Sequence, residues 1–439
     1  MIDVSQLTPK QRDAVNNALD VSKRCAAITG AAGTGKTTIM QIVYEKLKEA
    51  GYDPVVAAPT GKAAKRIREA TGLPSMTLHM LLEYTAPHDI DEKTGKPFGA
   101  TYPRRDNTRP LDYDTVLADE YAMVNRELHA NLVKALPTGG RLIVFGDDSQ
   151  LPPIEENSKL VGEPSAFKMI FDKFNGVTLD KIHRQDADSG IINNASRIKN
   201  GMAPLKCDDF DIIYTDKHIE HILEACANDD YTLLTNQIIT PSNNTFIGTV
   251  KLNILLQANI ANANPTFVLP RHRWHEKYPV SIGVGEKVIL KKNWYDVPCH
   301  DYNGDELPSG MFNGEVGLVK EITDLHEVLI DTGDRIVTLP PVVQIVWDNK
   351  VSMGYPQRDL QLAYVVTTHN AQGCEFDNVV YTMSSSQFML LNRRNLYTGV
   401  TRAKKRVTVI SDMRAMSKSI NTKEPVVFSN RSMVKVGAA

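Results

Sequence analysis

A short glycine-rich segment near the start of the chain constrains the fold more than any other feature. Residues 30–38 read GAAGTGKTT and stand between an apolar run, CAAIT (25–29), and an amphipathic segment, TTIMQIVYEKLKEAG (37–51). Glycines let a backbone turn with its N–H groups facing inward, where they bind phosphate oxygens, and a helix that begins there adds its positive N-terminal end. The order strand, glycine-rich loop, helix therefore predicts a phosphate-binding loop in an α/β domain.

The main polar residues of such a phosphate-binding loop have expected roles. Lys36 reaches the β- and γ-phosphates of a nucleoside triphosphate, and the hydroxyl of Thr37 binds Mg²⁺. Other members of the loop surround the phosphate oxygens: Gly30, Gly33, Thr34, Gly35 and Thr38. The segment thus predicts binding of a nucleotide with Mg²⁺.

An acidic pair at the end of a second apolar run indicates hydrolysis. In TVLADE (115–120), Asp119 follows a strand and can hold Mg²⁺ through water, while Glu120 can orient or deprotonate an attacking water. Alone, the pair could be an ordinary acidic strand end. Downstream of a phosphate-binding loop, it predicts a catalytic role.

A third strand end carries a polar side chain that could sense a nucleotide. RLIVFGDDSQLPPI (141–154) reads as a strand followed by Gln150 and a rigid Leu-Pro-Pro turn. If this strand lies in the same sheet, Gln150 could sense the γ-phosphate. The alternative is a turn that the prolines merely stiffen.

Seven segments in order resemble the helicase motifs of superfamily 1, most closely those of the RecD/Dda-like branch of small 5′→3′ DNA helicases from bacteria and phages. The resemblance extends from Gln11 to Arg402, nearly the whole chain. It rests on APTGKAAKRI (58–67), TLH (77–79), ADE (118–120), GDDSQLPPI (146–154), HRQ (183–185), YVVTTHNAQGCEFDNVV (364–380) and LYTGVTRAKKRV (396–407).

The resemblance implies an α/β fold of two RecA-like P-loop domains with ATP and Mg²⁺ between them. The implied domains are 1A (1–80 and 111–178), a pin insertion 1B (81–110), 2A (179–285 and 356–439) and an SH3-like insertion 2B (286–355). The residues of the last insertion agree, because EKVILKK, FNGEVGLVKEI, EVLIDT, RIVTLP and VQIVWD are short Val/Ile-rich runs separated by turn residues.

Several residues would complete the ATP site. The resemblance gives Arg184 and Arg402 as arginines that contact the γ-phosphate from the opposite domain, although either could be a surface charge. It gives Gln11 as a reader of the adenine edge, yet Thr8-Pro9-Lys10-Gln11 is also a good helix-capping box. Two further residues would line the ATP side of domain 2A: Gln372 and Glu375.

A translocase must hold nucleic acid without reading its sequence, through backbone N–H groups, small hydroxyls and stacking aromatics. By resemblance and by their place at strand ends, the expected contacts are Pro59, Thr60, Lys62, Thr77, His79, Thr240, Asn243, Thr367, Thr368 and His369. Each threonine could instead be a turn or cap hydroxyl. Phe98 or Tyr102 would be the stacking aromatic of a pin built on the turn at 93–96, unless 81–110 is a surface loop.

These features predict an ATP-dependent single-stranded DNA translocase and DNA helicase, with 5′→3′ polarity inferred by analogy from the short insertions. Its partners would be single-stranded DNA, tailed or forked duplexes, and single-strand-binding or replisome proteins, in replication, recombination or repair. The alternative is a DNA-stimulated ATPase that displaces bound proteins. A P-loop kinase or transport ATPase would leave residues 146–154, 364–380 and 396–402 unexplained.

The composition argues against several kinds of site and segment, but it does not by itself indicate a function. A net charge of −2 means that any DNA-binding face is local, and five scattered cysteines without C-x-x-C spacing argue against a zinc site or a disulfide framework. No run approaches about 18 apolar residues, and the N-terminus lacks a signal peptide. We expect a cytoplasmic monomer that does not enter membranes, with a tail after residue 413 whose role the sequence leaves open.

Overall fold

The computed structural model of the 439-residue chain describes residues 7–31, 33–84, 89–90, 97–98, 102–153, 155, 163–181, 189–227, 232–260, 265–270, 280–347, 350–423, 428–429 and 432–433. Three parts can be distinguished. We call them the first unit (7–181), the second unit (189–260 and 363–423) and the β insert (265–362).

The first unit is built on a six-stranded sheet of order β3-β2-β6-β7-β1-β8, with every pair parallel. Its strands are β1 (Cys25–Gly30), β2 (Pro54–Ala58), β3 (Ser75–Thr77), β6 (Thr115–Ala118), β7 (Arg141–Gly146) and β8 (Val177–Leu179). Separate apolar clusters cover the two faces, as expected for a parallel sheet that is buried on both sides.

One helix of this unit precedes β1, and the others lie along the chain between successive strands. They are α1 (Pro9–Leu19), α2 (Lys36–Glu49), α3 (Gly61–Thr71), α4 (Leu78–Leu81), η2 (Tyr121–Met123), α5 (Arg126–Ala135) and α6 (Ala166–Lys173). The predicted order of strand, glycine-rich loop and helix is confirmed at β1 and α2. Gly51 follows α2 with a positive φ of 85°, and the next N–H, that of Tyr52, donates to the Leu47 carbonyl at 3.0 Å.

The second unit has a five-stranded sheet of order β22-β10-β23-β24-β9, again with parallel pairs. The strands are β9 (Phe210–Tyr214), β10 (Asn236–Thr240), β22 (Val365–Thr367), β23 (Phe376–Met383) and β24 (Ala403–Ser411). The helices are α7 (Gly190–Lys199), α8 (His218–Cys226), α9 (Thr249–Ile260), η5 (Ser385–Leu390), α10 (Arg393–Val400) and α11 (Met413–Asn421).

The β insert interrupts the second unit between α9 and β22. Its main sheet is antiparallel, with the order β15-β14-β18-β17-β16-β13-β21. The strands are β13 (Lys287–Leu290), β14 (Cys299–His300), β15 (Glu306–Leu307), β16 (Val316–Ile322), β17 (Val328–Asp331), β18 (Ile336–Leu339) and β21 (Leu360–Leu362). The short helix η4 (Pro356–Asp359) precedes β21. All five runs predicted as strands in 286–355 are strands.

Four smaller strand pairs complete the described elements. They are β4 (Asp89–Ile90) with β5 (Pro97–Phe98), β11 (Phe267–Val268) with β12 (Ser281–Ile282), β19 (Val343–Trp347) with β20 (Lys350–Gly354), and β25 (Phe428–Ser429) with β26 (Ser432–Met433). Among the helices that the structure describes, none is long and apolar enough to cross a membrane.

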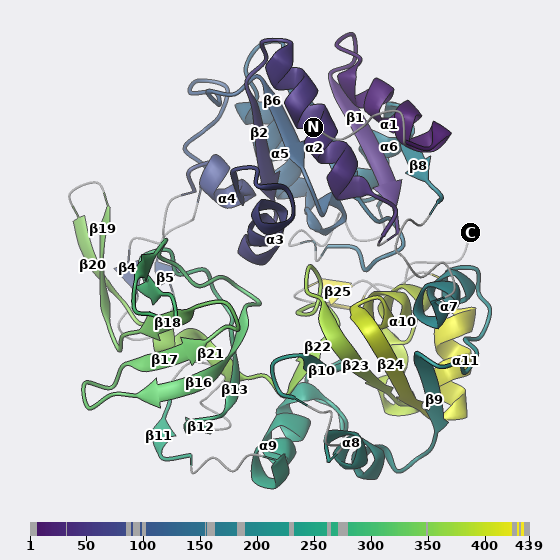
Figure 1. Cartoon of the computed structure of the whole chain (residues 1–439), viewed down its shortest axis with the longest axis vertical. Coiled ribbons are helices and arrows are strands. Elements are labelled where there is room, and N and C mark those ends of the chain that lie inside the picture. The colour runs from purple at the N-terminus through teal and green to yellow at the C-terminus, as the bar shows by residue number, and fades with distance from the viewer. Residues whose placement is uncertain are drawn as a thin grey trace.

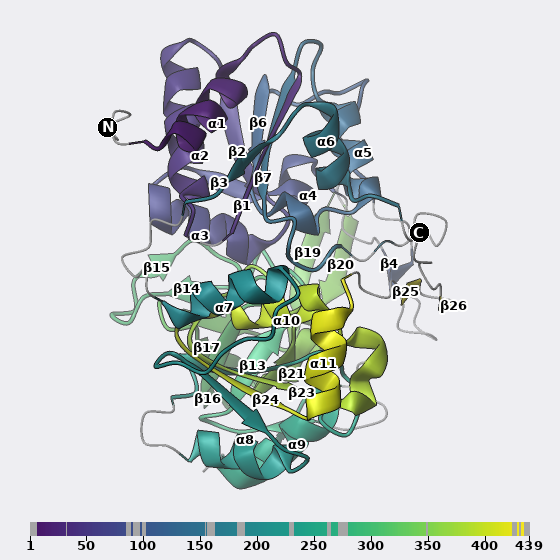
Figure 2. The same cartoon turned by 90° about the vertical axis from the view of Figure 1, so that its right-hand side faces the viewer.

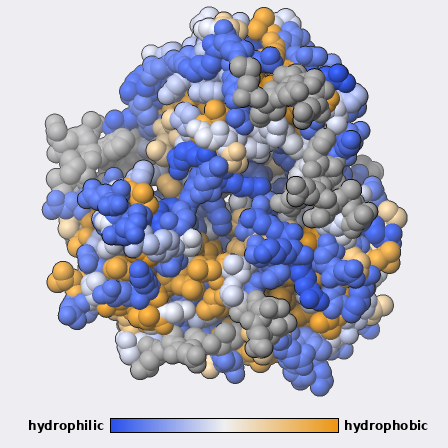
Figure 3. All heavy atoms as spheres, viewed as in Figure 1, coloured by the Kyte–Doolittle hydropathy of each residue, from blue (hydrophilic) through white to orange (hydrophobic). Residues whose placement is uncertain are grey.

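In both ribbon views the six-stranded sheet of the first unit and its helices lie above the other two parts, whereas Figure 1 shows β4 and β5 beside the β insert (Figures 1 and 2). In Figure 1 the β insert lies at the lower left and the second unit at the lower right. Hydrophilic residues cover much of the band where the first unit meets the lower parts (Figure 3).

Candidate nucleotide and nucleic-acid site

The loop between β1 and α2 has the geometry of a phosphate cradle. Gly35 is left-handed, with φ of 87°, and a Cβ there would lie 2.6 Å from Nε2 of Gln11. The ammonium of Lys36 donates to the carbonyls of Gly30 at 2.5 Å and Ala31 at 3.0 Å, so it lies over the loop itself. Glycine at position 35 is therefore required by both conformation and space.

Gln11 connects helix α1 to this loop. Its Oε1 accepts from the Thr8 N–H at 3.0 Å, which completes the predicted capping box, and its Nε2 donates to the Thr34 carbonyl at 3.2 Å. The side chain is buried, with 6% exposed. The capping role is confirmed, and the contact with adenine stays a prediction.

Asp119 and Glu120 follow β6 at the same sheet edge as the loop, because the strands are parallel. Glu120 is left-handed, with φ of 49°, and its N–H donates to Oδ1 of Asp119 at 2.8 Å. Burial and the charge of Asp119 raise the pKa of the Glu120 carboxyl, while Arg402, Lys36 and Arg66 oppose that rise. Charged residues of both units therefore influence the Glu120 carboxyl group. The backbone of Glu120 is itself in the left-handed region, which is strained for a residue other than glycine.

Arg402 reaches this site from the second unit. It lies between α10 and β24 with only 3% of its surface exposed, and its Nε donates to the Thr398 carbonyl at 2.9 Å. A second guanidinium nitrogen donates to the Cys374 carbonyl at 3.4 Å. The other predicted arginine, Arg184, lies outside the described residues.

Three more predicted ATP-site residues lie where the units meet. Gln150 is buried in the turn after β7, and its Oε1 has no hydrogen-bond partner among the described residues. Gln372 donates to the Leu151 carbonyl at 3.0 Å across the junction. Glu375 pairs with Arg66 of α3 at 2.7 Å, so it also faces the first unit.

Two of the predicted nucleic-acid contacts of the first unit, Thr60 and Thr77, are the N-cap residues of helices. Thr60 caps α3 by accepting from the Ala63 N–H at 3.2 Å, and Thr77 caps α4 while lying 3.5 Å from the Tyr295 hydroxyl of the β insert. A Cβ added to Gly373 of the second unit would lie 3.6 Å from the Thr60 hydroxyl. Thr60 is thus brought next to the segment that carries Thr367, Thr368 and His369.

Lys62 and His79 are two more predicted contacts of the first unit. Lys62, three residues after Pro59, has its ammonium 5.4 Å from the centre of the Phe376 ring. His79 is exposed and its ring lies 4.8 Å from that of Tyr84.

The predicted contacts of the second unit divide into buried and exposed residues. Thr240 and Thr368 are fully buried; the Thr240 hydroxyl donates to the Ile247 carbonyl at 2.9 Å, and that of Thr368 donates to the Thr240 carbonyl at 3.4 Å. Thr367 is nearly buried and accepts the Asn370 N–H at 3.3 Å. Asn243 is exposed and His369 partly so. Thr367 has the local turn role, whereas the hydroxyls of Thr240 and Thr368 bond to carbonyls farther away in the chain. Contact of these threonines with DNA stays a prediction.

Sequence reasoning missed Gln387, which organises this hydroxyl cluster. Its buried Nε2 lies within hydrogen-bond distance of the hydroxyls of Thr240 at 2.8 Å, Ser242 at 2.9 Å and Thr245 at 3.2 Å. The signal was present, because Ser384 and Gln387 form a capping box.

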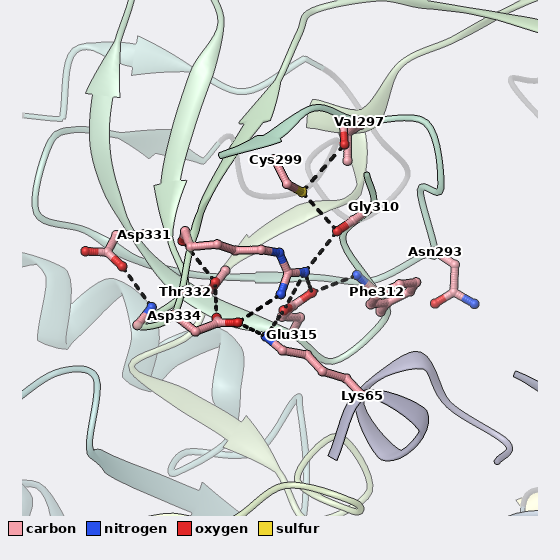
Figure 4. A network of polar contacts seen from close by, with 12 residues as sticks. Lys65, Asn293, Val297, Cys299, Gly310, Phe312, Glu315, Asp331, Thr332 and Asp334 are labelled. Atoms are coloured by element: carbon pink, nitrogen blue, oxygen red, sulfur yellow. Dashed lines mark hydrogen bonds and ion pairs between the residues drawn. The ribbon is translucent and has the colours of Figure 1, made fainter. Parts of the chain in front are cut away.

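An ionic network that sequence reasoning also missed joins α3 to the β insert (Figure 4). Lys65 pairs with Asp334 and, at 3.4 Å, with Glu315, which in turn pairs with buried Arg335 at 3.0 Å. A Cβ on the neighbouring Gly61 would lie 2.2 Å from Cγ of Phe312.

The proposed pin is described only by its backbone. Asp89 pairs with Phe98 and Ile90 with Pro97 in the antiparallel pair β4–β5. The Phe98 side chain lies outside the described part of the chain, whereas Tyr102 is 54% exposed.

Comparison with known proteins agrees with this geometry. Residues 6–222 match the family described as AAA domain, and residues 362–410 match the UvrD-like helicase C-terminal domain. The chain is 28% identical over 389 residues to the ATP-dependent RecD2 DNA helicase of Deinococcus radiodurans, covering 87% of this chain and 46% of that protein. It therefore spans about half the length of that relative.

A second relative is matched over more of its length. The RecBCD enzyme subunit RecD of Mycobacterium tuberculosis is 26% identical over 457 residues, covering 95% of this chain and 72% of that protein.

Two solved structures share the fold. Pif1 helicase from Bacteroides in complex with ADP-AlF3 and ssDNA is 21% identical with a TM-score of 0.58, covering 95% of this chain and 94% of that one. Bacteroides Pif1 bound to ssDNA is 20% identical with a TM-score of 0.56, covering 93% and 92%. The predicted pair of RecA-like α/β domains agrees with this likeness, and the predicted family resemblance is confirmed. By its motifs and its relatives, the chain resembles the RecD-like superfamily 1 helicases, and it shares its fold with Pif1 helicases.

Proposed function

We propose that the chain is an ATP-dependent single-stranded DNA translocase and DNA helicase with 5′→3′ polarity. The observation that carries the proposal is the divided site: Gln372 of the second unit donates to the Leu151 carbonyl at 3.0 Å and Glu375 pairs with Arg66 at 2.7 Å, so the segment with these two residues lies against the first unit, which carries Lys36 and Glu120. Such a division lets each nucleotide cycle change how the two units sit against each other.

The residues present suit ATP and Mg²⁺. Lys36 and the left-handed glycines Gly33 and Gly35 form an anion cradle at the start of α2, and Thr37 with Asp119 would hold the metal ion. When bound, MgATP supplies the phosphoanhydride whose cleavage drives the cycle.

Each of the proposed catalytic residues would have its own role in ATP hydrolysis. Glu120, whose pKa is raised by burial and by Asp119, would accept a proton from the attacking water. Arg402 and Lys36 would stabilise the charge that develops on the transferred group from opposite sides. Gln150, buried at the junction, would contact the γ-phosphate end of the site.

Single-stranded DNA would cross the junction where Thr60 faces Gly373 and Thr77 faces Tyr295. We assign residues 1–80 with 111–178 to domain 1A and residues 179–285 with 356–439 to 2A. The pair β4–β5 would belong to a pin, 1B (81–110), with Phe98 or Tyr102 as its stacking aromatic. Residues 286–355 would form an SH3-like domain, 2B. The proposed polarity is the one that the resemblance to the RecD/Dda-like helicases implies. The Pif1 structures named above contain or bind single-stranded DNA, which supports this substrate.

Steady-state ATPase activity with and without single-stranded DNA tests the proposal, followed by unwinding of 5′-tailed and 3′-tailed duplexes. We expect strong stimulation and unwinding of the 5′-tailed duplex. Preference for the 3′ tail would refute the polarity, and absence of stimulation would refute the proposed binding of DNA at the junction.

The role of the pin is tested separately by Phe98→Ala. We expect this variant to lose unwinding while it keeps ATPase activity and movement on single strands. Equal losses in all three assays would contradict the pin. Intact unwinding together with lost displacement of DNA-bound proteins would favour a protein-displacing ATPase instead.

A further inference from the structure

The turn after β7, residues 147–151, is bound by side chains of the second unit. The Tyr397 hydroxyl donates to Oδ2 of Asp147 at 2.8 Å, and both residues are 2% exposed. The other oxygen, Oδ1, accepts from the Ser149 N–H at 3.0 Å within the turn. A carboxylate buried at the junction thus depends on a tyrosine from the opposite unit for one of its hydrogen bonds.

The contacts come from one face of helix α10. Arg394, Tyr397 and Thr398 stand at positions i, i+3 and i+4, which share a face of a helix. The Leu151 N–H donates to the Thr398 hydroxyl at 3.0 Å, and the Arg394 guanidinium donates to the carbonyls of Asp148 at 2.8 Å and Gln150 at 3.3 Å. Three side chains of α10 therefore hold one five-residue turn.

The same helix face leads directly to the arginine of the ATP site. While the hydroxyl of Thr398 accepts from the first unit, its carbonyl accepts from Nε of Arg402 at 2.9 Å. Arg402 is close enough to Glu120 to oppose the rise in its pKa. A chain of buried polar contacts thus runs from the turn at Asp147, through α10, to Arg402.

We propose that Tyr397 is a positioning residue whose hydrogen bond to Asp147 seats α10 on the first unit and so aligns Arg402 for phosphoryl transfer. This inference rests on the proposed function, because it assigns the alignment of the same ATP site. Without the hydroxyl, Asp147 would remain buried with one partner fewer, and the seated arrangement of the two units would lose stability. Arg402 would then spend less time in its reactive position.

The test compares two tyrosine-to-phenylalanine variants of the full chain. Tyr397→Phe removes the bond between units. Tyr381→Phe removes a bond of the same kind inside the second unit, where the buried Tyr381 hydroxyl donates to Oδ1 of Asn395 at 3.0 Å. With saturating ATP and single-stranded DNA, we expect kcat to fall about 10- to 100-fold in Tyr397→Phe and less than about threefold in Tyr381→Phe. Both variants should retain the wild-type affinity for ADP.

A double-mutant cycle separates alignment from loss of structure. If Tyr397 acts through Arg402, then adding Tyr397→Phe to Arg402→Ala should lower kcat by less than about twofold more. Asp147→Asn can keep both hydrogen bonds, because its amide oxygen can accept from the Ser149 N–H while its NH2 donates to the Tyr397 hydroxyl, so it should retain most of the wild-type kcat.

Two results would overturn the inference while leaving the proposed function intact. In the first, the wild-type enzyme shows DNA-stimulated ATPase activity, but kcat falls no more in Tyr397→Phe than in Tyr381→Phe. The other is a full additional loss from Tyr397→Phe in the Arg402→Ala background. Absence of ATPase activity in the wild-type protein would instead refute the proposed function itself.

Discussion

The phosphate-binding loop and the junction between the units are both polar, but they are built from different kinds of contact. In the loop, Lys36 bonds to carbonyls five and six residues away. At the junction, Tyr397 bonds to a carboxylate 250 residues away, and Lys65 to another 250 residues away. The loop can be formed by one short segment, whereas the junction exists only when all three parts are folded and seated.

Removing the catalytic carboxylate should have the largest effect. Glu120→Gln keeps the shape of the site and the cradle, so ATP binding should persist while hydrolysis falls by about 100-fold or more. Titration with a fluorescent ATP analogue and a steady-state ATPase assay measure the two properties. Glu127→Gln, an exposed change in α5, is the control. Normal turnover in Glu120→Gln would show that another residue activates the water.

A substitution in the cradle tests how far local contacts determine it. Gly35→Ala forces an alanine into φ of 87° and against Gln11, so ATP affinity should fall about tenfold or more. Gly139→Ala is matched, because Gly139 has φ of 81° and open space around its Cα. It should lose about 1 kcal/mol of stability without loss of ATP affinity. Equal ATP affinities in the two variants would mean that Gln11 does not restrict the loop.

Removing a lysine at the junction should lower the free energy of unfolding more than removing a lysine on the surface. Lys65→Ala removes the cation between Glu315 and Asp334 and should lower the free energy of unfolding by about 1–2 kcal/mol, measured by urea denaturation. Lys168→Ala breaks an exposed pair with Asp172, so its effect should be below about 0.5 kcal/mol. A similar cost for both would indicate that the network in Figure 4 adds nothing beyond a surface pair.

Two adjacent buried charges predict a smaller, pH-dependent effect at the boundary between the β insert and the second unit. Burial raises the pKa of Glu286 to about 7 and lowers that of Lys287 to about 7. Glu286 binds its proton more tightly when folded, so its contribution to stability is lost as pH rises from about 4.5 to 7. Lys287 binds its proton less tightly when folded, so stability rises from pH 7 toward 10.5.

The two trends meet near neutrality, where these groups together stabilise the fold least. Lys287→Met should therefore flatten the rise in unfolding free energy between pH 7 and 9, at most about 1.4 kcal/mol per pH unit. Urea denaturation at several pH values measures the slope. An unchanged slope would show that Lys287 is not the group responsible.

The same contrast explains what could be predicted from the sequence. The cradle, the capping box of Gln11 and the five strands of residues 286–355 follow from short patterns of glycine, cap residues and Val/Ile runs, so they were predictable. The bonds of Gln387 to three hydroxyls and of Tyr397 to Asp147 join distant segments, and no local pattern encodes their partners. Thr240 illustrates the limit, because its place at a strand end was predicted but its complete burial was not.

The interruption of the second unit by the β insert has a consequence for how the chain folds during synthesis. Every strand of the first sheet lies within residues 25–179, so that sheet can assemble while the ribosome is still translating the insert. In the second sheet, β9 pairs with β24 and β10 lies between β22 and β23, all of which come after the insert. Strands β9 and β10 therefore cannot pair until residues 365–411 have been synthesised. Until then their apolar side chains and unpaired edges stay accessible to chaperones.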